Sequence, residues 1–305
     1  MRRDLTLDLV RFGMLARRSD LLALGHPRSR VGAAVQSGAL HVPRRGWIAG
    51  DGADPRALRA VQLGGKLGGA SALAHRGVWV DDDPALVVAT APTASRLPPL
   101  RGGEARVWLP ERFAETTDAR WCASVRDAIL QYTLVAGRDQ LIATLDSGLV
   151  QRLLTWQEVD QLLPLVREAA RPGIRELDGL AMSGTESRMR VALRRRGLRV
   201  RTQVSIRRVG QVDLVVDDWL IVECDSKEHH SGESQQTADR RRDGNASLSS
   251  YDSARFAYSQ IMFDLDWCVS VVESHLRRGR PASLGQDKLQ SAGWSRSHPR
   301  AGPGE

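Results

Sequence analysis

Four acidic side chains in the C-terminal third of the chain have types and spacing that can carry chemistry. Residues 220–222 are almost continuously apolar, which predicts a buried strand, and this strand ends in Glu223 and Asp225. Side chains alternate along a strand, so Glu223 and Asp225 share one face. Asp213 lies on the preceding predicted strand and can share that face, and Glu186, on the helix before it, can approach from the side.

Carboxylates that converge in this way repel one another unless a cation neutralises them. Mg²⁺ or Mn²⁺ prefers oxygen ligands, and we expect Asp213, Glu223 and Asp225 to supply them. A bound ion of this kind lowers the pKa of a water molecule and stabilises charge on a phosphodiester oxygen. His229 and His230 follow as candidates for general base, general acid or phosphate contact. The alternative is that the carboxylates are structural, in exposed turns and in the cap of a helix.

The elements that must position these residues follow one another closely. Ser183 and Glu186 have capping-box spacing for a helix, and Gly197 is placed to end it. Three strand patterns come next, which indicates an α/β layer with an antiparallel hairpin. The predicted elements are a helix over 185–196, strands over 200–206, 212–216 and 220–224, and a closing helix over 263–276.

The same residues resemble a known nuclease family. Asp213, followed on the next strand by Glu223 and Asp225, resembles the PD-(D/E)xK nuclease core. More closely, three segments look like the Vsr-like endonucleases of a domain-of-unknown-function family: 211–214 (QVDL), 221–225 (IVECD) and 228–230 (EHH). Gln203, residues 239–243 (DRRRD) and Arg255-Phe256 match that pattern too.

The resemblance implies a restriction-endonuclease-like fold over residues 183–276 and metal-dependent cleavage of DNA. The sequence departs from the family pattern at three places. Asp225 stands where the archetype has its lysine, with Lys227 two residues further on, and Ser226 replaces a glycine. The last strand, 252–256, has small residues where the group has bulky aliphatic ones, so a degenerate nuclease is the alternative to an active one.

The first 50 residues hold almost all of the chain's excess positive charge. They carry nine arginines and three aspartates, net +6, of a total of +8. A concentrated excess of this kind indicates a nucleic-acid partner. The positions of its capping residues, glycines and prolines predict helices over 20–24 and 27–37 and two strands, 39–42 and 47–49, around a turn at 43–46. That order is typical of a winged helix-turn-helix.

The basic residues of this region stand where such a module contacts DNA. Arg28 and Arg30 fall at the start of the second helix, which enters the major groove, and Arg44 and Arg45 fall at the wing. Residues 19–22 (SDLL) and 45–49 (RGWIA) are similar to the winged-helix domain of AbiEi-type antitoxins. The alternative is a helical hairpin with a solvated basic face.

The rest of the chain carries less chemistry. We expect 1–52 to be the winged helix-turn-helix, 53–175 an α+β linking or docking domain, 176–280 the endonuclease-like domain and 281–305 a disordered tail. The run 64–69 (GGKLGG) fails as a phosphate loop because Leu follows the lysine. Residues 188–208 hold nine arginines and no acid, either a phosphate-tracking stripe or solvated surface.

These observations predict a cytoplasmic α/β protein that binds DNA and, with Mg²⁺ or Mn²⁺, acts as an endonuclease in repair, defence or a toxin–antitoxin system. The alternative is a non-catalytic antitoxin or transcriptional regulator whose nuclease fold is a binding platform. The expected partners are DNA and a cognate toxin or operon partner, with no membrane. Three distant cysteines exclude a disulfide scaffold, and no apolar run is long enough for a membrane span.

Overall fold

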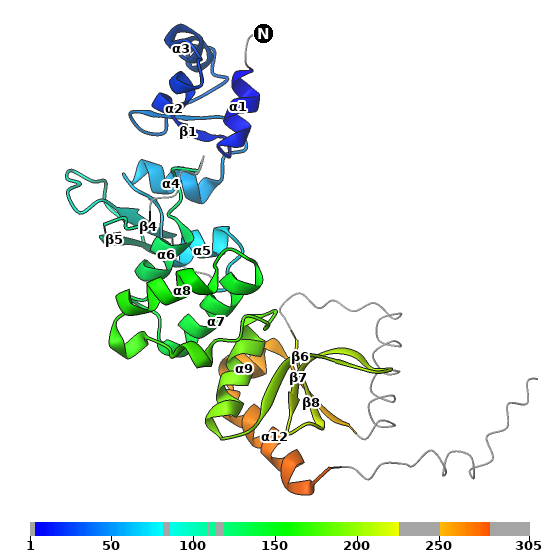
Figure 1. Ribbon diagram of the computed structural model, residues 1–305. Coiled ribbons are helices and arrows are strands. Elements are labelled where there is room, and N and C mark those ends of the chain that lie inside the picture. Colours follow the sequence, from blue (N-terminus) through cyan, green and yellow to red (C-terminus); the bar gives the residue numbers. More distant parts are fainter. Residues whose placement is uncertain (1–3, 82–85, 109, 114–118, 226–250, 281–305) are drawn as a thin grey trace, which may run out of the picture. The chain divides into compact units, whose positions relative to one another are not determined.

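The chain folds into a mixed α/β structure with small sheets (Figure 1). The computed structural model describes residues 4–81, 86–108, 110–113, 119–225 and 251–280, so the predicted tail lies outside it. Contacts divide the chain into two compact units, Met1–Gly184 and Thr185–Glu305, and each is described here by itself. Among the described residues, no helix has the length and apolar character needed to cross a bilayer.

The first unit begins with a small helical module around one apolar cluster. Asp4 caps its first helix by accepting the N–H groups of Thr6 and Leu7. Leu9, Leu21 and Ile48, all almost fully buried, bring the helices and the second strand together. The elements are α1 (Leu5–Arg11), β1 (Leu15–Arg17), α2 (Arg18–Ala23), α3 (Arg28–Gln36) and β2 (Trp47–Ala49).

The two predicted helices and the strand at 47–49 are confirmed, but the predicted hairpin partner is wrong. Residues 39–42 form no strand, and only His41 bridges to Ala49. Instead β2 pairs in antiparallel register with β1, Leu15 opposite Ala49. The buried strand β2 needs a hydrogen-bonded neighbour, and β1 supplies it because Leu15 is itself buried, whereas His41 and its successor are exposed.

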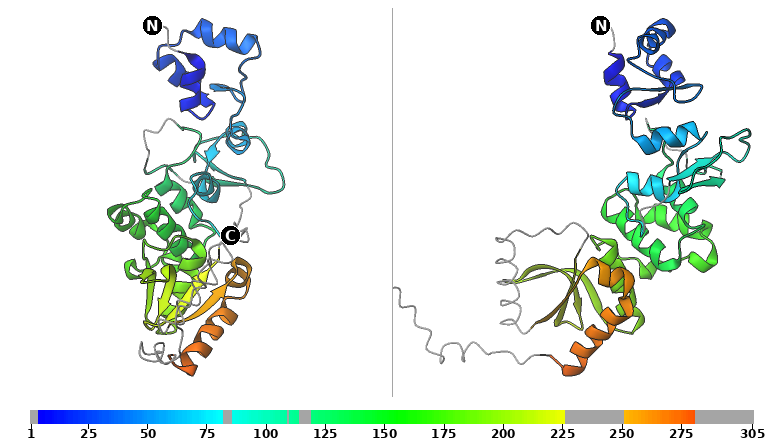
Figure 2. Two further views of the ribbon diagram at one scale, coloured as in Figure 1. Left: turned by 90° about the vertical axis from the view of Figure 1, so that its right-hand side faces the viewer. Right: turned by 180° about the vertical axis from the view of Figure 1, so that it is seen from behind.

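The remainder of the first unit places helices around a three-stranded mixed sheet (Figure 2). In this sheet β3 pairs antiparallel with β4, and β4 pairs parallel with β5. The elements are α4 (Pro55–Gln62), β3 (Lys66–Leu67), α5 (Gly69–His75), β4 (Leu86–Thr90), β5 (Glu104–Trp108), α6 (Val125–Tyr132), α7 (Arg138–Val150) and α8 (Trp156–Leu162).

The second unit is a four-stranded sheet with helices on one face (Figure 1). Its strand order is β6-β7-β8-β9, antiparallel except for the last pair. Leu214 and Val222 from the sheet pack against Met189 of α9 and Val272 of α12 in one buried cluster. The predicted helix and three strands are confirmed. The elements are α9 (Gly184–Arg195), β6 (Val200–Ile206), β7 (Gly210–Val216), β8 (Leu220–Cys224), β9 (Asp252–Phe256), α11 (Tyr258–Phe263) and α12 (Leu265–Arg278).

The hairpin of β6 and β7 changes faces halfway along its length. Val200 belongs to the cluster under the helices, yet Val204 and Ile206, at positions of the same parity, pack in a second cluster. Strict alternation would keep all three on one face. Between them Gln203 has φ +53°, a conformation that non-glycine residues rarely adopt. The hairpin therefore bends at Gln203 and presents its distal half to the other face of the sheet.

Close packing in the first unit generates a stability prediction. A Cβ atom added at Gly65 would lie 2.3 Å from the carbonyl oxygen of Ala89, whereas one added at Gly32, inside α3, would meet nothing within 4 Å. We expect Gly65→Ala to destabilise the protein by about 1–3 kcal/mol through overpacking. Gly32→Ala, the matched control, should stabilise it by up to about 1 kcal/mol through helix propensity. Urea denaturation followed by circular dichroism measures both, and a Gly65→Ala protein as stable as Gly32→Ala would contradict the packing.

Candidate functional site

A row of polar side chains crosses the sheet of the second unit. Gln203 and Asp213 both lie between the register pairs Thr202–Leu214 and Val204–Val212 of β6 and β7. Asp213 and Glu223 come directly beyond Leu214–Val222, the last register pair of β7 and β8. On the next strand Arg255 is the register partner of Glu223. Asp213 and Glu223 are half-buried and Arg255 is exposed. One amide, two carboxylates and one guanidinium are therefore neighbours at one level of the sheet.

The two carboxylates continue the hydrogen bonding where the β7–β8 ladder stops. The last regular pair of that ladder is Leu214 with Val222. Beyond it the N–H of Cys224 donates to Oδ2 of Asp213 at 2.8 Å, and the N–H of Asp213 donates to Oε2 of Glu223 at 3.1 Å. Side-chain oxygens thus take N–H bonds that backbone carbonyls accept elsewhere in the ladder. Both carboxylates are fixed by the fold itself.

Gln203 connects this pair to the helix α9. Its Nε2 donates to Oε2 of Glu186 at 2.8 Å and, more weakly, to Oδ1 of Asp213 at 3.4 Å. Its Oε1 accepts a bond of 2.7 Å from Nε2 of Gln211. Glu186 is only 4% exposed, so this amide contact is formed almost out of water. The strained backbone at Gln203 thus lies where its side chain joins two acidic groups.

Three carboxylates of the site affect the pKa of a buried thiol, that of Cys224. Burial raises the pKa of the Cys224 thiol well above its usual value, and the charges of Asp213, Glu186 and Glu223 raise it further. Cys224 lies in the cluster under the helices, as expected for a small buried hydrophobic residue. The thiol therefore stays neutral near physiological pH.

The donor types at this site fit a hard divalent cation. Mg²⁺ is commonly held by one or two carboxylates, with water and substrate phosphate completing its shell. Asp213 and Glu223 supply two adjacent carboxylates. Within the described residues, no group of three or more acidic, imidazole or thiol side chains is placed to share one ion, so a set that includes Asp225 is not preassembled. His229 and His230, together with the segment 239–243, lie outside the described residues.

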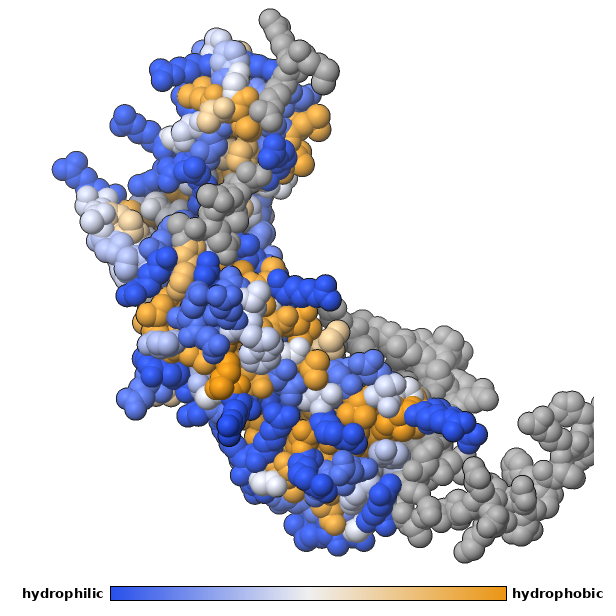
Figure 3. Space-filling view, viewed as in Figure 1, coloured by the Kyte–Doolittle hydropathy of each residue, from blue (hydrophilic) through white to orange (hydrophobic). Residues whose placement is uncertain are grey.

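The predicted DNA-contacting arginines of the first unit divide into two kinds. Arg28 and Arg30, in the first turn of α3, are exposed, and Arg45 is exposed in the turn before β2. Hydrophilic side chains project from this module on the side that Figure 3 shows. Arg44 differs, because it is half-buried and its Nη1 donates to the carbonyl oxygen of Gln62 at 3.0 Å.

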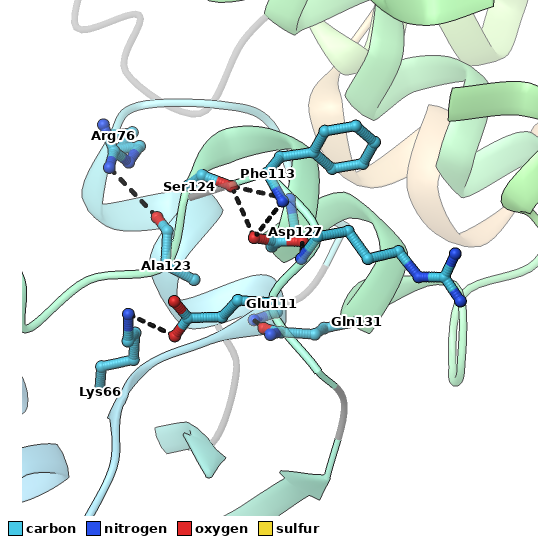
Figure 4. Close-up of polar contacts among 10 residues, drawn as sticks. Lys66, Arg76, Glu111, Phe113, Ala123, Ser124, Asp127 and Gln131 are labelled. Atoms are coloured by element: carbon cyan, nitrogen blue, oxygen red, sulfur yellow. Dashed lines mark hydrogen bonds and ion pairs between the residues drawn. The ribbon is translucent and has the colours of Figure 1, made fainter. Parts of the chain in front are cut away.

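A cavity of about 890 Å³ in the first unit has a different character from the polar row. It contains Lys66, whose Nζ pairs with Oε1 of Glu111 at 2.5 Å (Figure 4). The glycines on either side of Lys66 use their N–H groups within the protein: Gly65 donates to the carbonyl oxygen of Ala60, and Gly69 donates to Oε1 of Gln131. A phosphate loop needs such N–H groups for its ligand, so this run is a structural turn.

The acidic residue next to that cavity is also structural. Asp127, almost fully buried, accepts the N–H groups of Arg112 and Phe113 at 2.9 and 3.2 Å and the hydroxyl of Ser124 at 3.1 Å (Figure 4). These bonds satisfy the carboxylate and hold the segment 110–113 against the start of α6.

Sequence reasoning did not assign Gln203, Gln211 or Arg255 to the site. Gln203 and Arg255 matched a family pattern, but no role followed from it, because the register of a sheet decides which side chains are neighbours. No local signal distinguished Gln203, because Arg201, Thr202 and Ser205 of the same strand are polar too.

No family model matches this chain, and no curated protein matches it either. The description of the site therefore depends on the geometry alone.

The network generates a prediction about pH. In Gln203→Glu a fourth carboxylate would face Glu186 and Asp213, and repulsion would hold its folded-state pKa above its unfolded value. The introduced carboxyl group avoids this repulsion only while it is protonated, and it loses its proton as pH rises. The free energy of unfolding of the variant should therefore be little reduced at pH 4 and reduced by roughly 1–3 kcal/mol at pH 7. Gln260→Glu is the control, because Oε1 of Gln260 accepts a backbone N–H that a carboxylate also accepts well. Equal destabilisation of Gln203→Glu at both pH values would contradict the network.

Proposed function

We propose that this chain is a DNA-binding protein whose second unit is a Mg²⁺-dependent, endonuclease-like domain that hydrolyses phosphodiester bonds. The observation that carries the proposal is the polar row Gln203–Asp213–Glu223–Arg255, with Glu186 attached to it through Gln203. Acidic groups fixed side by side at the end of a strand ladder, next to a cationic side chain, suit a reaction at a phosphate held through a metal ion.

Each residue of the row has a role that its position supports. Asp213 and Glu223 would hold Mg²⁺ or Mn²⁺, with Asp225 near the end of the same strand as a further ligand. When bound, the ion supplies a water of lowered pKa and stabilises charge on the phosphodiester oxygen. Arg255, exposed beside Glu223, would contact the phosphate of the DNA. Gln203 and the buried Glu186 keep Asp213 in place.

The first unit supplies DNA contacts in this proposal. Helices α2 and α3 with the short connection between them have the order of a helix-turn-helix, and β1 and β2 form the small sheet of a winged module. The exposed Arg28 and Arg30 lie at the end of α3 that would meet base edges. Arg45 would contact phosphate, while Arg44 contributes packing against α4.

The family resemblances are part of the same proposal. A Vsr-like endonuclease domain combined with an AbiEi-like winged helix would fit a protein of DNA repair, defence or a toxin–antitoxin system, with a cognate toxin or operon partner. His229 or His230 would then assist proton transfer.

A second function is favoured by one observation. Asp213 and Glu223 each accept a backbone N–H bond, which gives both carboxylates a structural role without any metal. A non-catalytic antitoxin or transcriptional regulator, with the nuclease fold as a platform for DNA or protein, would keep these bonds and lose the chemistry. Substitutions at Asp213 or Glu223 therefore distinguish the two functions.

Asp213→Asn tests the endonuclease. The amide keeps the shape but removes the charge that holds the cation, so Mg²⁺- or Mn²⁺-dependent nicking of plasmid DNA should fall by about 10²-fold or more. DNA affinity should stay within about twofold. Asp217→Asn is the matched control, because Asp217 lies in the β7–β8 turn away from the row.

The second function, a non-catalytic regulator, would be supported by different results of the nicking and stability measurements. In that case the wild type does not nick DNA with either ion, and Asp213→Asn loses stability through the weakened bond to the N–H of Cys224.

A separate prediction concerns recognition by the first unit. Replacing Arg28 and Arg30 together by alanine should cost roughly 1–3 kcal/mol per lost base contact and relax any sequence preference. Arg45→Ala should weaken binding to all sequences alike and lower the salt dependence by about one counterion. Fluorescence anisotropy with a selected site and a scrambled site measures both effects. A uniform loss in the Arg28/Arg30 variant would contradict a reading role for α3.

A further inference from the structure

A second pocket lies on the bent hairpin of the second unit. Its volume is about 430 Å³, within the range of small-ligand sites. Arg201, Arg207 and Arg208 line it together with Ser205 and the ring of Tyr251. Four of these five residues come from β6 and the turn after it, and the bend at Gln203 carries that turn to the face on which Tyr251 packs.

The described lining of the pocket is positively charged. Among the residues that the structure describes, it contains three guanidinium groups and no acidic side chain. Arg201 has an ion pair with Asp218 at 3.4 Å, but both side chains are about half exposed, so the charge is only weakly compensated. Arg207 and Arg208 are exposed at the turn. Guanidinium groups bind phosphate oxygens with two parallel hydrogen bonds, which makes a phosphate group the expected ligand.

The aromatic residue gives the pocket a second kind of contact. Tyr251 is half-buried and packs against the apolar cluster of Ile206, Val212 and Val215, which holds its ring in place. A fixed aromatic ring beside arginines is the arrangement on which unpaired bases stack while their phosphates are neutralised. Bases in a duplex are stacked on each other and do not offer a free face.

Arg255, at one end of the polar row, lies on the same face of the sheet as the pocket. Tyr251 precedes β9, and Arg255 follows four residues later at a position of the same parity, whereas Ala254 and Phe256 point into the core under the helices. Four residues of strand span about 13 Å, a distance that a few nucleotides of an unpaired strand can cover.

We propose that this pocket binds one unpaired nucleotide of DNA, with its phosphate between the arginines and its base on Tyr251, a few nucleotides from the phosphate held at the polar row. The inference rests on the proposed function and narrows it, because the substrate becomes DNA with a single-stranded segment rather than an intact duplex.

Binding in the absence of divalent ions tests the pocket separately from catalysis. The full chain is titrated in EDTA against a labelled 12-nucleotide thymidine strand and against a 12-base-pair hairpin duplex, with fluorescence anisotropy as the readout. Tyr251→Leu, which keeps the apolar packing, should weaken single-strand binding roughly 5- to 150-fold, the range for one lost base–aromatic stack. Tyr251→Phe should bind as the wild type does, and duplex affinity should change less than twofold in both.

The arginines are tested by charge-matched double variants. Arg207→Ala/Arg208→Ala should lower the slope of log affinity against log salt by about 0.7 for the single strand, since the phosphate held between the arginines is no longer neutralised. Arg199→Ala/Arg277→Ala, also two exposed arginines of this unit, is the control and should leave the slope unchanged. Equal slopes in the two double variants, or single-strand affinity within twofold of wild type for Tyr251→Leu, would overturn the proposal.

Two further outcomes are decisive. If Tyr251→Leu weakens single-strand and duplex binding equally, the preference for an unpaired nucleotide is wrong. If the wild type binds the strand as expected but nicks no DNA with Mg²⁺ or Mn²⁺, the proposed endonuclease activity is wrong, while the proposed nucleotide-binding pocket is supported.

Discussion

The organisation of the second unit depends on how the N–H groups are satisfied where β7 and β8 part. A strand that leaves its neighbour exposes N–H groups that must find other acceptors, because an unpaired buried N–H costs about 1–3 kcal/mol. Here Asp213 and Glu223 provide them, through bonds to the N–H of Cys224 and to the N–H of Asp213. The result is two carboxylates fixed side by side in half-buried positions. Their proximity is unfavourable by itself, and the hydrogen bonds offset it.

The bend at Gln203 is the second part of the same arrangement. A regular strand would send Val204 and Ile206 into the core under α9 and α12, but the positive φ at Gln203 carries them to the opposite face. The same residue bonds to Glu186 and, more weakly, to Asp213. Contacts to acidic groups thus offset the backbone strain at Gln203. The bend also positions the residues of both the polar row and the arginine pocket.

Much of this unit could be predicted from the sequence because its signals are local. Segments rich in β-branched or apolar residues at 200–206, 212–216 and 220–224, separated by turn residues, predicted the strands. The capping-box spacing of Ser183 and Glu186 predicted the helix. The alternation of Glu223 and Asp225 with the apolar Val222 and Cys224 placed the acids on one face. Short-range patterns of this kind depend on few competing interactions.

The errors have long-range causes. In the first unit β2 pairs with β1 rather than with residues 39–42, because Leu15 of β1 is buried. A strand of only three residues is too short for its sequence pattern to predict this pairing. Gln203 belongs to the site through its hydrogen bonds to Glu186 and Asp213, and Arg255 through its register with Glu223; both depend on tertiary structure. Arg44, predicted at the wing, bonds to the carbonyl oxygen of Gln62, a residue of a helix that the sequence did not reveal. Side-chain neighbours across strands could not be read from spacing alone.

The polar row thus has two aspects: a structural one, which the hydrogen bonds account for, and a chemical one, which requires a cation. Structural carboxylates have no need of a metal, whereas two adjacent carboxylates that serve phosphodiester chemistry do. Isothermal titration of the full chain with Mn²⁺ measures this difference most directly. We expect one Mn²⁺ to bind at millimolar or tighter concentrations, and Glu223→Gln to weaken this binding about tenfold or more. A wild type that binds no Mn²⁺ at millimolar concentrations, with or without DNA, would contradict a chemical role for the polar row.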